Sequence, residues 1–265
     1  MTIFDSHAHY NDEAFGTREE RLALLEEIKS AGVSYILNAG TNPDSSLESL
    51  DLAEHSPGVF ASVGIHPEDL FHIEDKEAAL SQIRALASHP KAVAIGEIGL
   101  DYHWHGDERE LQKTWFDRQL TLAEELDLPV IIHDREAHGD CLEIALSHPG
   151  VTGVFHSFSG SIETARELID HGWYLSVSGV VTFKNAARIL GVVPTVPDDR
   201  LLIETDCPYL TPHPFRGKRN DSRYLTYTVE AVAALRGTTP KSIAALTLRN
   251  AARLFSKCGI PTSSV

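Results

Sequence analysis

The chain of 265 residues is long enough for one large domain, and a content of 42% hydrophobic and 23% charged residues is typical of a globular protein. No apolar run approaches the roughly 20 residues that a membrane-spanning helix needs, so we expect no membrane association. The formal net charge of −15 disfavours tight, nonspecific binding to duplex nucleic acid, because an acidic surface repels phosphates.

The start of the chain and its cysteines indicate a compartment and a ligand chemistry. The first residues have neither the basic region nor the apolar region of a signal peptide, so we expect a cytoplasmic protein. Cys141, Cys207 and Cys258 include no CxxC pair, which argues against a disulfide framework and against a thiolate zinc cluster. A metal site would therefore use nitrogen and oxygen ligands. No feature indicates an obligate protein partner.

Along the chain, short apolar runs alternate with segments that have the apolar spacing of helices. Eight runs have the length and composition of strands: 2–4, 35–38, 60–64, 93–96, 130–132, 153–155, 173–177 and 201–203. Helical spacing is found at 18–31, 45–54, 108–126, 136–147, 162–171, 222–236 and 240–255. This alternation indicates parallel strands joined by crossover helices, and eight repeats favour a closed barrel, so we predict a single (β/α)₈ TIM-barrel domain over residues 1–265. A short helix and two prolines within residues 182–197 define the seventh crossover only poorly.

Titratable residues follow the predicted strands. In a TIM barrel the loops after the strands meet at one mouth, where the chemistry lies. His7 and His9 follow the first run, and side chains two residues apart in an extended chain point the same way. The other candidates end or follow the fourth, fifth, sixth and eighth runs: Glu97, His133, His156 and Asp206. The pattern therefore predicts six metal ligands from five strand ends.

Each of these residues also has an ordinary structural interpretation. Single histidines, or an HxH pair, are common as surface or hydrogen-bonded side chains. Glu97 could form an ion pair with a neighbouring strand, and Asp206 could cap a following helix. The joint placement favours the metal site, because chance would scatter such groups over both ends of the barrel and over the helices.

The ligand set limits both the metal and the reaction. Four imidazoles and two carboxylates suit Zn²⁺, Mn²⁺, Fe²⁺ or Co²⁺, and Mg²⁺ also fits where a phosphate adds oxygens. Six ligands exceed one tetrahedral shell, so we expect two divalent ions, with Glu97 bridging an ion at the N-terminal histidine pair and an ion at His133 and His156. Asp206 would bind the first ion and orient or deprotonate the attacking water, as in a hydrolase without a covalent intermediate.

Six longer motifs cover most of the chain. They are HAHYND at 7–12, GIHP at 64–67, GEIGLDYH at 96–103, PVIIHDREAH at 129–138, FHSFSGS at 155–161 and ETDCPYLTPHPFRGKRN at 204–220. Together they resemble the TatD family of metal-dependent deoxyribonucleases, within the amidohydrolase superfamily. The resemblance implies a TIM barrel, dependence on two divalent ions (Mg²⁺, Mn²⁺ or Zn²⁺), the same six ligands, and 3′ to 5′ exonuclease activity on single-stranded DNA ends.

The resemblance also implies roles outside the metal shell. His66 matches a family histidine expected near the scissile phosphate, although the turn at Pro67 would equally well fix it. Arg216 fits a phosphate clamp, but it could also be a solvated ion-pair partner. Asp101 would hydrogen-bond a ligand histidine or simply begin the loop after its strand.

Four further residues are assigned no part in the metal shell. Cys207 stands beside a predicted ligand, and we expect it to be an inert, packed thiol. His103 and His105 are candidates for the mouth of the barrel, and their roles are open. We expect Asn250 to be structural.

Two other functions stay open from the sequence. A related hydrolase that cleaves an amide, a lactone or the ester of a D-aminoacyl-tRNA would use a similar site. Many such enzymes carry a carboxylated lysine at the fourth strand, whereas this chain has Glu97, which favours the nuclease-like branch. A noncatalytic metal-binding or nucleic-acid-binding barrel is the second alternative, but no missing residue favours it. We therefore predict an enzyme that hydrolyses phosphodiesters at nucleic-acid ends, with Glu97 and Asp206 as its catalytic residues.

Overall fold

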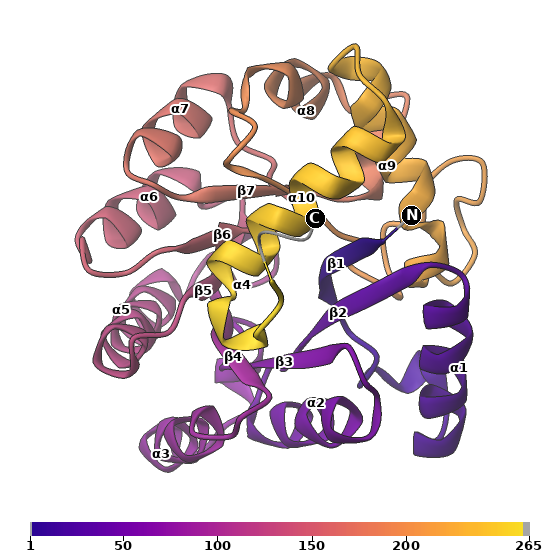
Figure 1. Cartoon of the computed structure of the whole chain (residues 1–265). Coiled ribbons are helices and arrows are strands. Elements are labelled where there is room, and N and C mark those ends of the chain that lie inside the picture. The colour runs from indigo at the N-terminus through magenta and orange to yellow at the C-terminus, as the bar shows by residue number, and fades with distance from the viewer. Residues whose placement is uncertain (1, 262–265) are drawn as a thin grey trace.

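The computed structural model describes residues 2–261 and contains one sheet of eight parallel strands in the order of the chain. The strands are β1 (Ile3–Ala8), β2 (Val33–Ala39), β3 (Val59–Val63), β4 (Ala92–Asp101), β5 (Val130–Arg135), β6 (Gly153–Phe155), β7 (Tyr174–Val177) and β8 (Leu201–Ile203). Every predicted run overlaps one of these strands. Figure 1 shows the strands around a common axis with helices outside them, which confirms the predicted TIM barrel.

Helices surround the strands or cover an end of the barrel (Figure 1). They are α1 (Arg18–Ser30), α2 (Pro43–His55), α3 (Lys76–Ala87), α4 (Tyr102–His105), α5 (Arg109–Leu126), α6 (His138–Leu146), α7 (Ile162–Asp170), α8 (Ala187–Val192), α9 (Leu225–Leu235) and α10 (Pro240–Leu254). The segment of α3 carries no predicted helix, although Ala79, Ile83 and Ala87 bury one face at four-residue spacing. In segment 182–197, where the sequence defines the crossover poorly, α8 leads directly into a 3₁₀ turn at Val193–Thr195. None of the described helices is both long and apolar enough to cross a membrane.

An interior cluster fills the barrel, and α10 seals it from one end. Each strand contributes to this cluster: Phe4, Leu37, Phe60, Val93, Ala94, Ile131, Val154, Tyr174 and Leu202. The end of the chain adds Leu248, Ala251, Leu254 and Phe255. Asn250 of α10 donates its side-chain amide to the carbonyl oxygens of Asp198 and Leu201, which is the structural role expected of it. Figure 1 shows α10, in yellow, lying across the near end of the barrel, so the opposite end holds the functional site.

Strand β4 is longer than the sequence indicated, and it is irregular in the middle. Its register against β5 shifts between Ile95 and Ile98, so Glu97 lies at the irregularity. Gly99 lets the two strands approach closely: its φ is +138°, and a Cβ atom there would lie 2.0 Å from the carbonyl oxygen of His133. The glycine therefore helps to position two predicted ligands on neighbouring strands.

The barrel closes between β1 and the chain just after β8. The amide of Asp206 donates to the carbonyl oxygen of His7 over 3.0 Å, and the amide of His9 donates to the carbonyl oxygen of Cys207 over 2.8 Å. The first and last strands are thus joined by the residues that carry predicted ligands.

A buried carboxylate reinforces this closure. Asp5 of β1 accepts the amide of Thr205 at 2.9 Å, its hydroxyl at 2.6 Å and the hydroxyl of Ser222 at 2.6 Å. Burial raises the pKa of Asp5 to about 7, although these hydrogen bonds partly oppose the shift. Asp5 is therefore a structural group that holds β1 in place beneath the predicted ligands.

Candidate metal centre

All six predicted ligands lie together at the carboxyl end of the barrel. They come from β1 and the residue after it (His7 and His9), from β4 (Glu97), from β5 (His133), and from the loops after β6 and β8 (His156 and Asp206). All except the fully buried His7 line a cavity of about 1400 Å³. The six side chains that were predicted from their positions at strand ends therefore lie together in the structure.

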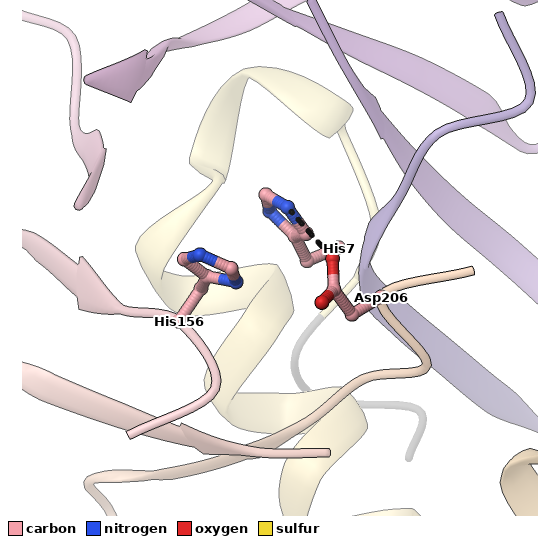
Figure 2. A group of neighbouring side chains, drawn as sticks. All are labelled: His7, His156 and Asp206. Carbon is pink, nitrogen blue, oxygen red and sulfur yellow. Dashed lines mark ion pairs between the residues drawn. The ribbon is translucent and has the colours of Figure 1, made fainter. Parts of the chain in front are cut away.

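The first group of ligands surrounds one oxygen of Glu97. The Nε2 atoms of His7 and His9 lie 2.9 Å apart, at 3.2 Å and 3.4 Å from Oε2 of Glu97. Oδ1 of Asp206 lies 3.7 Å from Nε2 of His7 and 3.4 Å from Nε2 of His9. Asp206 reaches this position with φ of +56°, a left-handed conformation that aspartate tolerates better than most residues. Figure 2 shows Asp206 and His156 on either side of His7.

The second group surrounds the other oxygen of Glu97. Nδ1 of His133 and Nε2 of His156 lie 2.8 Å and 2.9 Å from Oε1 of Glu97, and 3.2 Å from each other. Nε2 of His66 lies 3.4 Å from the same oxygen. The two groups adjoin, because the rings of His7 and His156 stack with centroids 4.0 Å apart. Glu97 therefore faces one histidine group with each of its two oxygens.

The donor atoms converge in a way that fits bound cations. Two ring nitrogens separated by 2.9 Å, as in His7 and His9, cannot both carry hydrogens, whereas a metal ion accepts a lone pair from each. Imidazole nitrogens with carboxylate oxygens are a common donor set for divalent transition metals. Among the described residues, three sets have ligand atoms within 4.8 Å of one another: His7, His9 and Glu97; His7, His156 and Asp206; and His66, Glu97 and His133. The residues present thus fit divalent metal ions.

The charges of the centre support the same interpretation. Burial by itself would raise the pKa of Glu97, but the imidazoles of His156, His66 and His7 hold it well below its ordinary value. Burial would lower the pKa of His156, but the carboxylates of Glu97 and Glu204 raise it well above its ordinary value. An ionised carboxylate, the form that binds metal, therefore lies between the two histidine groups.

Asp101 fulfils both of the roles considered for it. Its Oδ2 lies 3.0 Å from Nε2 of His133, the ring nitrogen directed away from Glu97. Its Oδ1 accepts the amides of His103 and Trp104 at 2.9 Å and 3.0 Å, and so begins α4. A carboxylate behind a histidine fixes the ring and strengthens it as a ligand.

Glu204 holds His156 in the same manner, although no role was predicted for it from the sequence. It is fully buried, and its Oε1 lies 3.3 Å from Nδ1 of His156 and accepts the amide of Ser157 at 2.6 Å. The available signal was a charged residue directly after an apolar strand, within the motif at 204–220. Asp206 follows the same strand, and for it the family resemblance also implied a role as a metal ligand.

The two predicted substrate contacts are placed differently. His66 belongs to the centre, and the amide of Glu68 donates to its Nδ1 at 3.2 Å, so the turn also holds it. Arg216 is exposed, with its guanidinium 3.9 Å from the centre of the Phe183 ring, and it does not line the cavity. A phosphate contact by Arg216 stays a prediction.

The remaining residues near the mouth lie outside the centre. His103 is bound to Glu136 at 2.8 Å, and His105 lines the cavity with its ring stacked on Phe71 at 4.0 Å. Within the described residues neither histidine belongs to a group that could hold a metal. Cys207 is fully buried, and burial raises the pKa of its thiol, as expected for an inert packed side chain.

Comparison with known proteins agrees with this geometry. Residues 4–256 match the family described as TatD related DNase. The chain is 44% identical over 256 residues to a protein of Bacillus subtilis (strain 168) named uncharacterized metal-dependent hydrolase YabD, covering 96% of this chain and 98% of the relative. It is 37% identical over 251 residues to a protein of Cronobacter sakazakii named 3′-5′ ssDNA/RNA exonuclease TatD, covering 91% of this chain and 94% of the relative.

Solved structures show the same relationship. YJJV, a TatD homologue from Escherichia coli K12, matches with a TM-score of 0.89 at 32% identity, covering 98% of both chains. A TatD family hydrolase from Entamoeba histolytica shares the fold, with a TM-score of 0.83 at 21% identity over 96% of this chain and 98% of the other. The chain therefore belongs to the TatD family and is a metal-dependent hydrolase.

Proposed function

We propose that this protein is a deoxyribonuclease that uses two divalent ions to remove nucleotides from the 3′ ends of single-stranded DNA. The observation that carries the proposal is the position of Glu97, whose Oε1 and Oε2 face separate histidine groups. Such a bridging carboxylate suits paired ions, which act on both the attacking and the leaving oxygen of a phosphodiester. The name of the relative from Cronobacter sakazakii, a 3′-5′ ssDNA/RNA exonuclease, supports the choice of substrate.

The metal-binding roles follow from the two groups of side chains. One ion would be held by His7, His9, Oε2 of Glu97 and Asp206, and the other by His133, His156 and Oε1 of Glu97. We propose Mg²⁺, Mn²⁺ or Zn²⁺ as these ions. When bound, they would neutralise phosphate charge and lower the pKa of water.

Asp206 and His66 act on the reacting groups. Burial would raise the pKa of Asp206, but the imidazoles around it, first of all that of His9, lower it, so the carboxylate is ionised. It can therefore orient the attacking water and accept its proton. The water oxygen forms a new bond to phosphorus while the bond from phosphorus to the 3′ oxygen of the preceding nucleotide breaks. That oxygen leaves and takes up a proton from solvent, and the released nucleotide keeps the phosphate. His66 lies on the cavity side of the centre, where it can donate a hydrogen bond to a phosphate oxygen.

A substrate panel tests this proposal. The protein is stripped with a chelator and assayed before and after addition of Mg²⁺, Mn²⁺ or Zn²⁺. The substrates are single-stranded DNA labelled at either end, duplex DNA, RNA and D-aminoacyl-tRNA. We expect metal-dependent release of mononucleotides from the 3′ end of single-stranded DNA. Turnover in the presence of chelator, or cleavage of the aminoacyl ester without cleavage of DNA, would overturn the proposal.

Two variants test the assigned roles. We expect Glu97→Ala and Asp206→Asn to lose turnover while retaining the circular dichroism spectrum of the folded protein. Glu110→Gln is the matched control, because its carboxylate is 90% exposed on α5, outside the cavity. Full activity in both Glu97→Ala and Asp206→Asn would show that the catalytic centre lies elsewhere.

A further inference from the structure

The mouth of the cavity carries exposed aromatic side chains. Large hydrophobic residues exposed within the described chain are Leu47, Trp104 and Tyr209, and the last two line the cavity. Trp104 of α4 is 60% exposed. An indole exposed beside a catalytic centre offers a flat face on which a nucleic-acid base can stack.

The position of Trp104 is fixed relative to the metal centre. The same carboxylate, Asp101, accepts the amide of Trp104 with Oδ1 and faces His133 with Oδ2. Gln112 of α5 donates its side-chain amide to the carbonyl oxygens of Asp101 and His105, both at 2.9 Å, and accepts the amide of Asp101 at 2.8 Å. These bonds hold the short helix α4, so the backbone that carries the indole is fixed beside the centre.

Charged residues divide the mouth into two sides. Asp12, Glu68 and Asp69 line it beside β1 and β3, whereas Arg135 and Arg188 line it at the end of β5 and on α8. A phosphate backbone is repelled by the first side and attracted by the second. The charges therefore favour a path for an anionic strand over β5 and α8.

Both arginines are available to phosphates. Within residues 2–261 neither guanidinium forms an ion pair: Arg135 lies 5.5 Å from the centre of the Trp104 ring, and Arg188 donates to the carbonyl oxygen of Ser159 at 3.1 Å. Asp134 also lines the cavity, but its Oδ2 is bound to His138 at 2.7 Å. In a chain with a net charge of −15, two arginines without carboxylate partners beside the centre indicate an anionic ligand.

We infer that Trp104, Arg135 and Arg188 form a subsite for the nucleotides that precede the one removed. Their bases stack on Trp104, and their phosphates contact the two guanidiniums. This inference rests on the proposed nuclease function and specifies how the strand is held. The cavity of about 1400 Å³ exceeds the roughly 300–1,000 Å³ of a small-molecule pocket, which leaves room for more than one nucleotide. Because stacking needs an open base face, the subsite selects single strands over duplexes.

Fluorescence provides a test that does not depend on turnover. The other two tryptophans, Trp115 and Trp173, are buried, so Trp104 is the indole that a base can reach. We expect a phosphorothioate oligothymidylate of eight nucleotides to quench the emission of the Mn²⁺-reconstituted protein. The quench should disappear in Trp104→Phe.

Affinity measurements separate the contributions of stacking and charge. By anisotropy of the same labelled oligonucleotide, Trp104→Ala should raise Kd roughly 5- to 100-fold, and Trp104→Phe should retain most of the affinity. Arg135→Ala and Arg188→Ala should each flatten the slope of log K against log salt by about 0.7, the value for one contact with a single strand. The controls are Leu47→Ala and Arg253→Ala, which remove exposed side chains on α2 and α10, outside the cavity.

The outcomes distinguish this subsite from the proposed reaction. Wild-type protein that binds the strand with the expected variant effects, yet cleaves no DNA, supports the subsite and contradicts the nuclease function. Cleavage with no change in Kd, quench or salt slope in the Trp104 and arginine variants contradicts the subsite alone. Failure of the wild-type protein to bind the strand also overturns the subsite.

Discussion

Replacing Glu204 by glutamine would remove a buried negative charge from behind His156 and keep the shape of the side chain. Oε1 of Glu204 accepts the amide of Ser157 and faces Nδ1 of His156, whereas the buried Oε2 has no hydrogen-bond partner among the described residues. Glutamine can retain the bond to Ser157 through its oxygen and place its NH₂ group where Oε2 now lies. The perturbation is therefore mainly electrostatic.

The size of the effect follows from the position of Glu204. Burial would lower the pKa of His156, and Glu97 and Glu204 together raise it well above its ordinary value. Loss of one of these two carboxylates makes His156 a weaker ligand. Loss of a partner behind a metal-binding histidine typically reduces metal affinity about 10- to 100-fold, or about 1.4–2.7 kcal/mol. The loss should fall on the ion proposed at His133 and His156, because the side chain of Glu204 forms no hydrogen bond or ion pair with His7 or His9.

Competition with a chelator of known affinity measures this effect. We expect two classes of metal site in the wild-type protein, of which one weakens 10- to 100-fold in Glu204→Gln while the other is unchanged. The urea midpoint of the metal-free variant should stay near that of the wild type. Unchanged affinity at both sites would refute the reasoning, and a lower midpoint with equal weakening of both sites would assign Glu204 to folding instead.

Three further predictions concern the scaffold. Phe255→Ala removes a fully buried ring that stacks on Phe4, with the ring centroids 6.1 Å apart. Unfolding in urea should show a free energy of unfolding that is lower by about 3–5 kcal/mol. A loss below about 1 kcal/mol would contradict the role of the interior cluster in sealing the barrel. Gly99→Ala should cost about 1–3 kcal/mol and weaken metal binding, because the new Cβ meets the backbone of His133; an unchanged urea midpoint would show that the strands can move apart. The pKa of Asp5 rises from 3.8 to about 7 on folding, so the folded state prefers the protonated acid. The stability that Asp5 gains from this preference is complete below pH 3.8 and is lost as the pH rises through about 7. The free energy of unfolding of the metal-free wild type should therefore fall over this range relative to that of Asp5→Asn. Parallel pH profiles of the two proteins would exclude a raised pKa of Asp5.

The strands were predictable because their signal is local. Each of the eight is an apolar run in the sequence, and the fold follows from their alternation with helices. Helix α3 was not predicted, and its buried face consists of two alanines and one isoleucine, Ala79, Ala87 and Ile83. The irregularity at Glu97 was not predicted either, because the register of a strand depends on its neighbour in space.

The six candidate ligands were predictable for a related reason. A parallel barrel brings all of its strand ends to one mouth, so residues that end strands are neighbours even when they are far apart in sequence. Glu204 was missed because burial decides whether a carboxylate at a strand end supports a ligand histidine. Arg135 and Trp104 were missed because both lie between the predicted strands and helices, where no pattern in the sequence assigns them a role, and only the cavity that they share distinguishes them.

The sequence by itself thus determined the barrel, the family and the set of candidate metal ligands that the fold brings together, since these depend on periodicity, strand ends and motifs. The tertiary structure alone decided which oxygen of Glu97 faces which histidines, and that Asp101 and Glu204 stand behind them. It also decided that Arg135 and Arg188, rather than the more conspicuous Arg216, line the cavity. The physical reason is that distance, burial and charge compensation arise between residues that only folding brings together.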